Sequence, residues 1–219
     1  NTPGVLNDAV CELAIGMLFG LLRRIPQAHE FVKSSAWSKG LFTVTTTLAG
    51  KQVGIAGMGR IGQDLAKRLE PFKVKIAYTG PSRKEVPYEY FADIKSLANS
   101  SDVLFLACPA SPDTEKMVDA EVLKALGPKG YLINIARGSV VDEAALLVAL
   151  QQKIIAGAAL DVFENEPNPN VGFLNIDNVL LTPHIGSATS ETRQLMTNLA
   201  IDNLEAFYNK KPLLTEVKN

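Results

Sequence analysis

Three residues with charged or titratable side chains, Arg137, Glu166 and His184, each stand in a short motif near the end of a predicted strand. A planar guanidinium can bind both oxygens of a carboxylate through parallel hydrogen bonds. An imidazole titrates close to neutral pH and can donate or accept a proton, and a neighbouring carboxylate favours its charged form. With a hydride-carrying cofactor, these groups supply most of what the reduction of a 2-keto acid requires.

A glycine-rich sequence, G-M-G-R-I-G, begins at Gly57 and follows a short apolar strand predicted over residues 53–56. It opens a predicted amphipathic helix, and this order of strand, loop and helix is typical of dinucleotide-binding sites. In such sites the first glycine, Gly57, permits a tight turn. The second, Gly59, lets the backbone approach a pyrophosphate, and the third, Gly62, lets the helix pack closely on the strand. A glycine-rich turn without a ligand is the alternative.

The residues after the second predicted strand indicate which dinucleotide binds. A cofactor without a 2′-phosphate is usually held by an acidic residue at the end of that strand. Residues 71–84 contain no acidic side chain, and Gly80 stands where the acid is expected. Ser82, Arg83 and Lys84 would instead attract a phosphate. We therefore expect NADP(H), with NAD(H) as the alternative if the basic residues form only a solvated loop.

Apolar runs alternate with helical patterns along most of the chain, which predicts an α/β fold with a parallel sheet covered on both faces. An apolar helix, with Asn7 and Asp8 as candidate caps, is expected to run from residue 7 to 34 and precedes this region. The predicted strands cover residues 53–56, 74–79, 103–107, 131–136, 155–162 and 179–182, and the later helices cover residues 60–69, 94–98, 120–126, 142–151 and 190–208.

The composition is that of an ordinary globular protein: 219 residues, 47% hydrophobic, with a net charge of −1. There is no basic excess to attract a nucleic acid, and the longest apolar run, residues 13–22, is too short to span a bilayer. Cys11 and Cys108 have no metal-ligand partner at useful spacing, so we expect no metal and two reduced thiols in a cytoplasmic protein. The chain starts at Asn1 without a methionine, and we expect an N-terminal portion to be missing.

Five segments, in order along the chain, resemble the D-2-hydroxyacid dehydrogenase family, and the resemblance covers essentially the whole chain. That family's fold is a Rossmann-type, doubly wound parallel sheet inserted in a substrate domain built from both chain ends. The resemblance implies a dinucleotide-binding domain over residues 1–204, including the 7–34 helix, and a segment, residues 205–219, returning toward a substrate domain whose N-terminal part is missing. The segments are N-T-P-G-V-L-N-D-A-V, G-M-G-R-I-G, I-N-I-A-R-G-S-V-V-D-E, L-D-V-F-E-N-E-P and L-T-P-H-I-G-S-A-T.

The resemblance also implies roles for individual residues. Arg137 would grip the carboxylate and keto oxygen of the substrate, His184 would donate the proton in reduction, and Glu166 would be its partner. The alternatives are a surface arginine and a buried, hydrogen-bonded histidine; Glu164 lies elsewhere in the motif and is not assigned. Asp161 would bind the nicotinamide carboxamide, with a strand-end cap as the alternative.

The expected cofactor site is drawn from the glycine fingerprint, the loop after the second strand and the family motifs. Cys108 is expected to contribute backbone contacts rather than act as a nucleophile. The cofactor-binding residues predicted in this way are Gly57, Gly59, Arg60, Ile61, Gly62, Ser82, Arg83, Cys108, Pro109, Ala136, Asp161 and Gly186.

Residues 77–83 are similar to the NADP-preferring glyoxylate and hydroxypyruvate reductases. We therefore expect an oxidoreductase that reduces one of these 2-keto acids to the D-2-hydroxy acid with NADPH. Glu166 argues against the formate dehydrogenase branch, which carries a glutamine there. The rival interpretations are an NAD-dependent D-2-hydroxyacid dehydrogenase, a dinucleotide-sensing corepressor-like binding module, and a fragment that only binds cofactor.

A homodimer is also expected from the resemblance. In the family, the long N-terminal helix and the segment after it, here residues 37–41, pack across the two-fold axis. Packing of the 7–34 helix within a monomeric core is the alternative. Trp37 is a candidate core residue or interface anchor.

Overall fold

The computed structural model describes residues 2–217, and within them seven parallel strands form one sheet in the order β3-β2-β1-β4-β5-β6-β7. Because every pairing is parallel, all the strands end at one edge, which we call the carboxyl edge; the opposite one is the amino edge. The strands are β1 (Gln52–Ala56), β2 (Lys75–Thr79), β3 (Glu89–Phe91), β4 (Val103–Leu106), β5 (Tyr131–Asn134), β6 (Gly157–Leu160) and β7 (Val179–Leu181).

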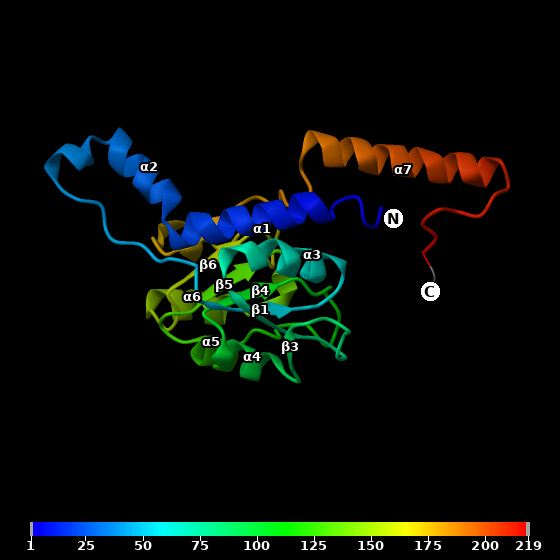
Figure 1. Ribbon diagram of the computed structural model, residues 1–219. Helices are drawn as coiled ribbons and strands as arrows, with labels where there is room; N and C mark the ends of the chain where they lie inside the picture. The colour runs from blue at the N-terminus through cyan, green and yellow to red at the C-terminus, as the bar shows by residue number, and fades with distance from the viewer. Residues whose placement is uncertain (1, 218–219) are drawn as a thin grey trace.

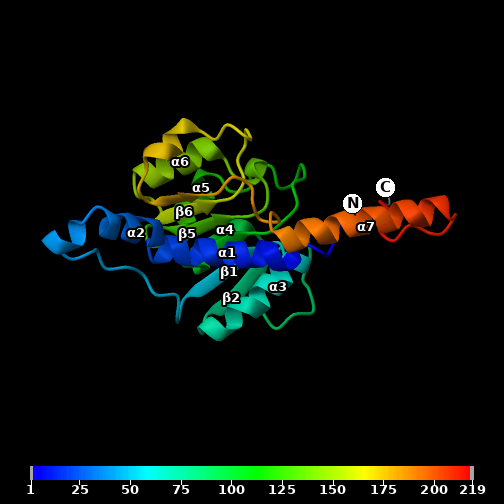
Figure 2. The ribbon, with the colours of Figure 1, turned by 90° about the horizontal axis from the view of Figure 1, so that it is seen from above.

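Helices cover both faces of the sheet (Figures 1 and 2). The helices α1 (Asn7–Leu22) and α3 (Arg60–Leu69) lie on one face, whereas α4 (Ile94–Ser100), α5 (Ala120–Leu126) and α6 (Glu143–Gln151) lie on the other. Successive residues of a strand alternate between the two hydrophobic cores, as Phe105 and Leu106 of β4 do. This two-sided burial explains why the strands are continuous apolar runs.

Side-chain caps fix where several helices begin. Asp93, Asp119, Asp142 and Thr189 precede α4, α5, α6 and α7 (Ser190–Tyr208), and each side chain accepts a hydrogen bond from a backbone amide in the first turn. The short 3-10 helices are η1 (Ala36–Lys39), η2 (Glu70–Phe72), η3 (Gly138–Val140) and η4 (Val171–Asn175).

The predicted alternation of strands and helices is confirmed. Each predicted strand is present, most of them shortened at one or both ends, and the helices predicted over residues 60–69, 120–126 and 190–208 have those bounds. The strand β3 was not predicted; it has three residues and is the outermost strand of the sheet, with only β2 as its partner.

The single helix predicted over residues 7–34 is wrong. The structure has two helices, α1 and α2 (Ile25–Lys33), separated by Arg24 in the left-handed conformation at φ 50°. Pro26 explains the break, because its ring and its missing N–H do not allow the α-helix to continue through Leu22. The capping role expected of Asn7 and Asp8 is also wrong, since Leu6 is the N-cap residue and makes no side-chain capping bond.

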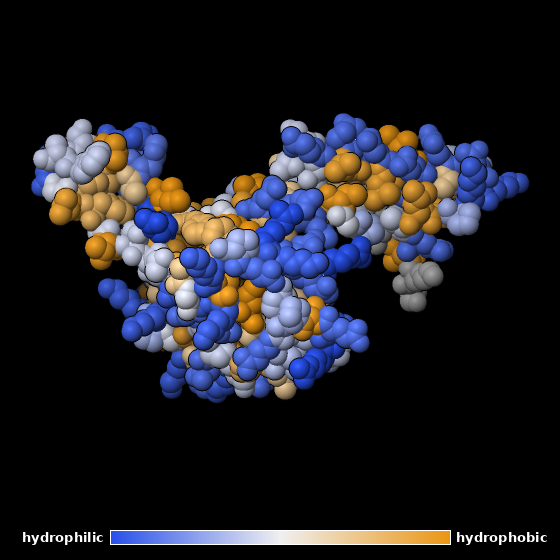
Figure 3. Space-filling view, viewed as in Figure 1, coloured by the Kyte–Doolittle hydropathy of each residue, from blue (hydrophilic) through white to orange (hydrophobic). Residues whose placement is uncertain are grey.

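Two segments stand away from the body of the domain (Figures 1 and 2). We call residues 25–44 the arm; none of the described side chains of α2 is buried, and Leu41 and Val44 are 93% and 95% exposed. The second segment is α7, with exposed apolar residues that include Leu204 and Phe207. In Figure 3 both segments carry orange, hydrophobic residues among blue, hydrophilic ones.

By contrast, α1 packs in the core. This packing explains why its residues are apolar around most of the helix, and no partner subunit is needed to explain it. Trp37 belongs to the arm and is 65% exposed, so it is no core residue within this chain. Among the described residues, no helix combines the length and the apolar character needed to cross a membrane.

Candidate functional site

The glycine loop lies at the carboxyl edge, between β1 and β4, where the strand order reverses. In open α/β sheets, ligands bind at this point. Gly57 has a φ of 102°, and a β-carbon there would lie 2.6 Å from the amide nitrogen of Cys108. A β-carbon on Gly62 would collide with the carbonyl oxygen of Gly57. Both positions therefore require glycine for the fold itself.

Gly59 requires a different explanation. No described atom lies within 4 Å of the place where its β-carbon would be, and the residue is exposed at the N-terminus of α3. This open space beside free helix N–H groups fits a pyrophosphate, which needs close approach of the backbone. The loop therefore fits the dinucleotide that its sequence predicts.

A cavity of about 540 Å³ adjoins this loop. Cys108 and Pro109 line it from the end of β4, and burial raises the pKa of the Cys108 thiol, which agrees with the expectation that this thiol is not a nucleophile. Of the predicted cofactor residues, Gly57, Gly59, Ser82, Cys108 and Pro109 line the cavity, whereas Arg60, Ile61, Gly62, Arg83, Ala136, Asp161 and Gly186 are not among its lining residues.

The loop after β2 forms one wall of the cavity. Ser82 and Lys84 line it, and Arg83 between them does not, so Lys84 supplies the loop's positive charge on the cavity side. No described atom lies within 4 Å of the place where a β-carbon of Gly80 would be. Two acidic residues, Asp93 and Asp113, also line the cavity, and both oxygens of Asp93 accept hydrogen bonds from Ser96.

The structure brings His184 and Glu166 together. Nδ1 of His184 lies 2.7 Å from Oε2 of Glu166, and Oε1 of Glu166 accepts a hydrogen bond from the amide of Phe163. Partial burial alone would raise the pKa of the Glu166 carboxyl. Hydrogen bonds from His184 and Phe163, with the charges of His184 and Arg137, outweigh this effect and hold the pKa below its ordinary value.

Asp161 holds the turn that carries His184. One carboxylate oxygen accepts hydrogen bonds from the Thr182 hydroxyl and the Ile185 amide, at 2.6 and 2.9 Å, and the other accepts one from the Gly186 amide at 2.9 Å. Asp161 is 2% exposed, and His184 has a φ of 53°. This conformation is uncommon for a non-glycine residue, and the hydrogen bonds of Asp161 to residues on both sides of His184 restrain the turn.

Arg137 is exposed at the carboxyl edge, just beyond β5. The turn that presents it is shaped by Asn134, which is 1% exposed. The Asn134 side chain donates to the carbonyl oxygen of Arg137 and accepts from the amide of Ala136. Sequence reasoning missed Asn134, although a polar residue inside an apolar strand is a signal of such a role.

The buried carboxylate of Glu143 is hydrogen-bonded to the segment that carries Glu166. Oε1 of Glu143 accepts a hydrogen bond from the amide of Glu164 at 2.6 Å, and Glu143 is 6% exposed. Burial raises the pKa of the Glu143 carboxyl. The hydrogen bond from the Glu164 amide lowers this pKa, the negative charge of Glu164 raises it, and the net shift is upward. Sequence reasoning missed Glu143 as well, because its position at the start of α6 resembles that of an ordinary first-turn acid.

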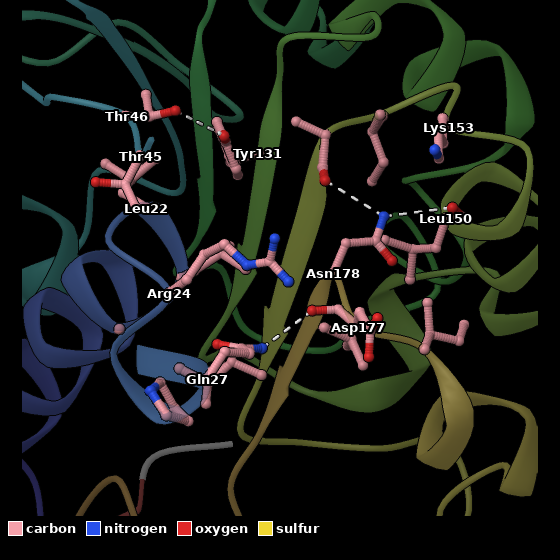
Figure 4. Close-up of a pocket in the computed structure, with 18 of the residues that line it drawn as sticks. Leu22, Arg24, Gln27, Thr45, Thr46, Tyr131, Leu150, Lys153, Asp177 and Asn178 are labelled. Carbon is pink, nitrogen blue, oxygen red and sulfur yellow. Dashed lines mark hydrogen bonds between the residues drawn. The ribbon is translucent and has the colours of Figure 1, made fainter. Parts of the chain in front are cut away.

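A larger cavity of about 820 Å³ lies at the amino edge, beside the root of the arm (Figure 4). Its lining includes Arg24 and Lys153, and the side-chain oxygens of Thr46 and Tyr131 meet there at 3.1 Å. None of the predicted catalytic or cofactor residues is among its described lining residues. The larger of these two cavities is therefore not the predicted chemical site, because the predicted catalytic residues lie at the carboxyl edge.

Comparisons with known proteins agree with this geometry. Residues 15–186 match the family model described as "D-isomer specific 2-hydroxyacid dehydrogenase, NAD binding domain". The chain is 48% identical to a hydroxyphenylpyruvate reductase of Plectranthus scutellarioides and 47% identical to glyoxylate/hydroxypyruvate reductase A of Arabidopsis thaliana; each match covers 99% of this chain and 70% of the relative.

The fold is also similar to solved structures. A crystal structure of an NADPH-dependent glyoxylate/hydroxypyruvate reductase from Sinorhizobium meliloti, in complex with NADP and malonate, superposes with a TM-score of 0.96 at 46% identity. The match covers 99% of this chain and 69% of that chain. The chain thus spans about 70% of the length of these relatives.

Proposed function

The chain belongs to the D-isomer-specific 2-hydroxyacid dehydrogenases, and on that premise we propose that it reduces glyoxylate or hydroxypyruvate to the D-2-hydroxy acid with NADPH. The observation that carries the proposal is the 2.7 Å contact between His184 and Glu166, at the same edge of the sheet as an exposed arginine and a dinucleotide-type glycine loop. A proton donor and a carboxylate anchor are what a 2-keto acid requires beside a hydride source.

Different residues of this chain would bind different parts of the cofactor. The N-terminus of α3 and Gly59 would hold the pyrophosphate, and Ser82 and Lys84 would hold a 2′-phosphate. We retain Arg83 as an outer contact of the same loop. When bound, the nicotinamide cofactor supplies the hydride.

The remaining residues act on the substrate. The Arg137 guanidinium binds the carboxylate of the keto acid and polarises its carbonyl group. His184 gives its proton to the carbonyl oxygen, and Glu166, in contact with Nδ1, keeps the ring oriented. Asp161 fixes the turn of His184, and one of its roughly four acceptor sites is left for the carboxamide role that the resemblance implies.

Initial rates test this proposal directly. The full-length enzyme is assayed with glyoxylate, hydroxypyruvate and hydroxyphenylpyruvate, each with NADPH and with NADH. We expect fast turnover of one of the two small acids and a strong preference for NADPH. Preference for NADH would contradict the cofactor assignment alone. Turnover of hydroxyphenylpyruvate alone would contradict the substrate assignment. Tight cofactor binding without turnover would favour a corepressor-like binding module.

We further propose that the enzyme is a cytoplasmic homodimer whose arms contact the partner subunit, and that residues 205–219 return toward a substrate domain. The exposed arm residues Trp37, Leu41 and Val44 support the first proposal, since exposed apolar patches mark interaction sites. Light scattering after size-exclusion chromatography tests it: Leu41→Glu should yield monomers, whereas Val148→Glu, on α6, should not. A monomeric wild-type protein would contradict it.

A further inference from the structure

The loop of residues 80–84 is fastened at both ends by tyrosine hydroxyl groups. The hydroxyl of Tyr78 accepts a hydrogen bond from the amide of Lys84 at 2.7 Å and donates to the carbonyl oxygen of the same residue at 3.2 Å. The hydroxyl of Tyr90 donates to the carbonyl oxygen of Gly80 at 3.2 Å. The first and last residues of the loop are thus both bonded to the sheet.

The two tyrosines are themselves held in place. Tyr78 lies in β2 and is fully buried, and Tyr90 is its register partner in the edge strand β3. Their rings pack with centroids 5.3 Å apart. A fully buried ring on a strand with neighbours on both sides has little freedom, so the position of the Tyr78 hydroxyl is set by the sheet.

On the cavity side, the positive charge of the loop belongs to Lys84, whose backbone is bonded to the Tyr78 hydroxyl. Ser82 and Lys84 line the cavity beside the glycine loop, but Tyr78 does not. Within the described part of the chain, the Lys84 ammonium group makes no ion pair. Both backbone polar groups of Lys84 are bonded to Tyr78, and they fix the direction in which its side chain leaves the backbone.

We propose that Tyr78 determines coenzyme selectivity as a positioning residue, by holding Lys84 and Ser82 where they bind the 2′-phosphate of NADP(H). The inference rests on the proposed use of NADPH. Residues 81–85 are all exposed, and without the hydroxyl their backbone would bond to water and sample several conformations. A phosphate needs an ordered loop, whereas NAD(H) carries no group for this loop to bind.

Tyr78→Phe tests the inference because it removes one oxygen atom and keeps the buried ring. The matched control is Tyr88→Phe, since the Tyr88 hydroxyl donates to Glu70 and not to the loop. Dissociation constants for NADP⁺ and NAD⁺ are measured by calorimetry on the full-length enzyme. Amide hydrogen exchange over residues 80–84 is measured without ligand.

We expect Tyr78→Phe to weaken NADP⁺ binding about fivefold, the ratio given by one typical hydrogen bond. Binding of NAD⁺ and kcat at saturating NADPH should stay within about twofold, and exchange of the Lys84 amide should accelerate. Tyr88→Phe should change none of these quantities. Equal weakening of both coenzymes would show a merely structural role and overturn the inference.

Two further outcomes separate the inference from the proposed function. If the wild-type enzyme prefers NADP⁺ and Tyr78→Phe binds it unchanged, only the role of Tyr78 is wrong. If the wild-type enzyme binds both coenzymes equally, the NADPH proposal fails, and the selectivity role of Tyr78 fails with it.

Discussion

Nδ1 of His184 lies 2.7 Å from Oε2 of Glu166, and the other ring nitrogen, Nε2, makes no hydrogen bond or ion pair with any residue that the structure describes. When Nδ1–H donates to the carboxylate, Nε2 is the atom available to give a proton to a substrate. Oε1 of Glu166 is bonded to the Phe163 amide, so the carboxylate cannot rotate away without losing a second hydrogen bond. The pair is therefore oriented before any ligand arrives.

Substitution of this pair should separate proton transfer from ring orientation. His184→Gln should lower kcat by about 10²–10⁴-fold, the usual contribution of a general acid. Glu166→Gln should lower it less, because the glutamine side chain keeps an oxygen that can accept from Nδ1 but removes the carboxylate charge. Initial rates with glyoxylate at saturating NADPH measure both effects. An unchanged kcat for Glu166→Gln would exclude the proposed partnership.

Asp161→Asn should loosen the His184 turn. An amide has one oxygen instead of two, so at least one of the three donors that Asp161 now satisfies loses its acceptor. We expect a stability loss of about 1.5–3 kcal/mol and a fall in kcat. Thermal melts and kinetics measure these effects, with the exposed Asp177→Asn as the control. Weaker binding of NADPH but not of 2′-phospho-ADP-ribose would add the carboxamide role; unchanged melts and rates would contradict the restraint.

Two glycine substitutions should have opposite signatures. Gly62→Ala places a methyl group against the Gly57 carbonyl and should destabilise the fold by about 1–3 kcal/mol. Gly59→Ala places it in open space, so the melting temperature should hardly change. The affinity for NADPH should nevertheless fall, because the methyl group enters the space left for the pyrophosphate. Denaturant unfolding and calorimetry distinguish the two, and full affinity in Gly59→Ala would place the pyrophosphate elsewhere.

Glu143 predicts a pH dependence of stability with a defined sign. Burial raises the pKa of its carboxyl above the ordinary value of 4.5 in the folded state. Its contribution to stability is therefore complete below that value and is lost as the pH rises through the raised pKa. Glu143→Gln keeps an acceptor for the Glu164 amide, so its melting temperature should rise relative to the wild type over this interval.

The control for this measurement is Glu115→Gln, since Glu115 is exposed and is not among the groups that shift the pKa of the Glu143 carboxyl. It should show no such trend. A difference between Glu143→Gln and the wild type that stays constant with pH would mean that Glu143 does not titrate there.

Much of the fold follows from local signals. Parallel strands buried on both faces give apolar runs, and such runs located each predicted strand. The edge strand β3 has neither length nor two neighbours, so its three residues carry no comparable pattern. The break near Arg24 had a local signal in Pro26, but the apolar periodicity on either side outweighed it.

The site was only partly predictable. Motifs identified Arg137, Glu166 and His184, and the structure brings the last two into contact; their catalytic roles stay predictions. The supporting residues could not be identified in this way. Asp161 bonds to residues more than twenty positions away, and Glu143 does so across 21 positions. Such bonds depend on which loops the sheet order places side by side, and no local pattern encodes that order.

The strand order also separates two tasks in space. The residues proposed to select the coenzyme follow β2 and are held by β3, at one end of the sheet, whereas Asp161 and His184 follow β6 and β7 at the other. The strands β1, β4 and β5 lie between them. Coenzyme preference and acid–base chemistry can therefore change independently. Substitutions confined to the loop of residues 80–84 can alter which coenzyme binds and leave the contact between His184 and Glu166 unchanged.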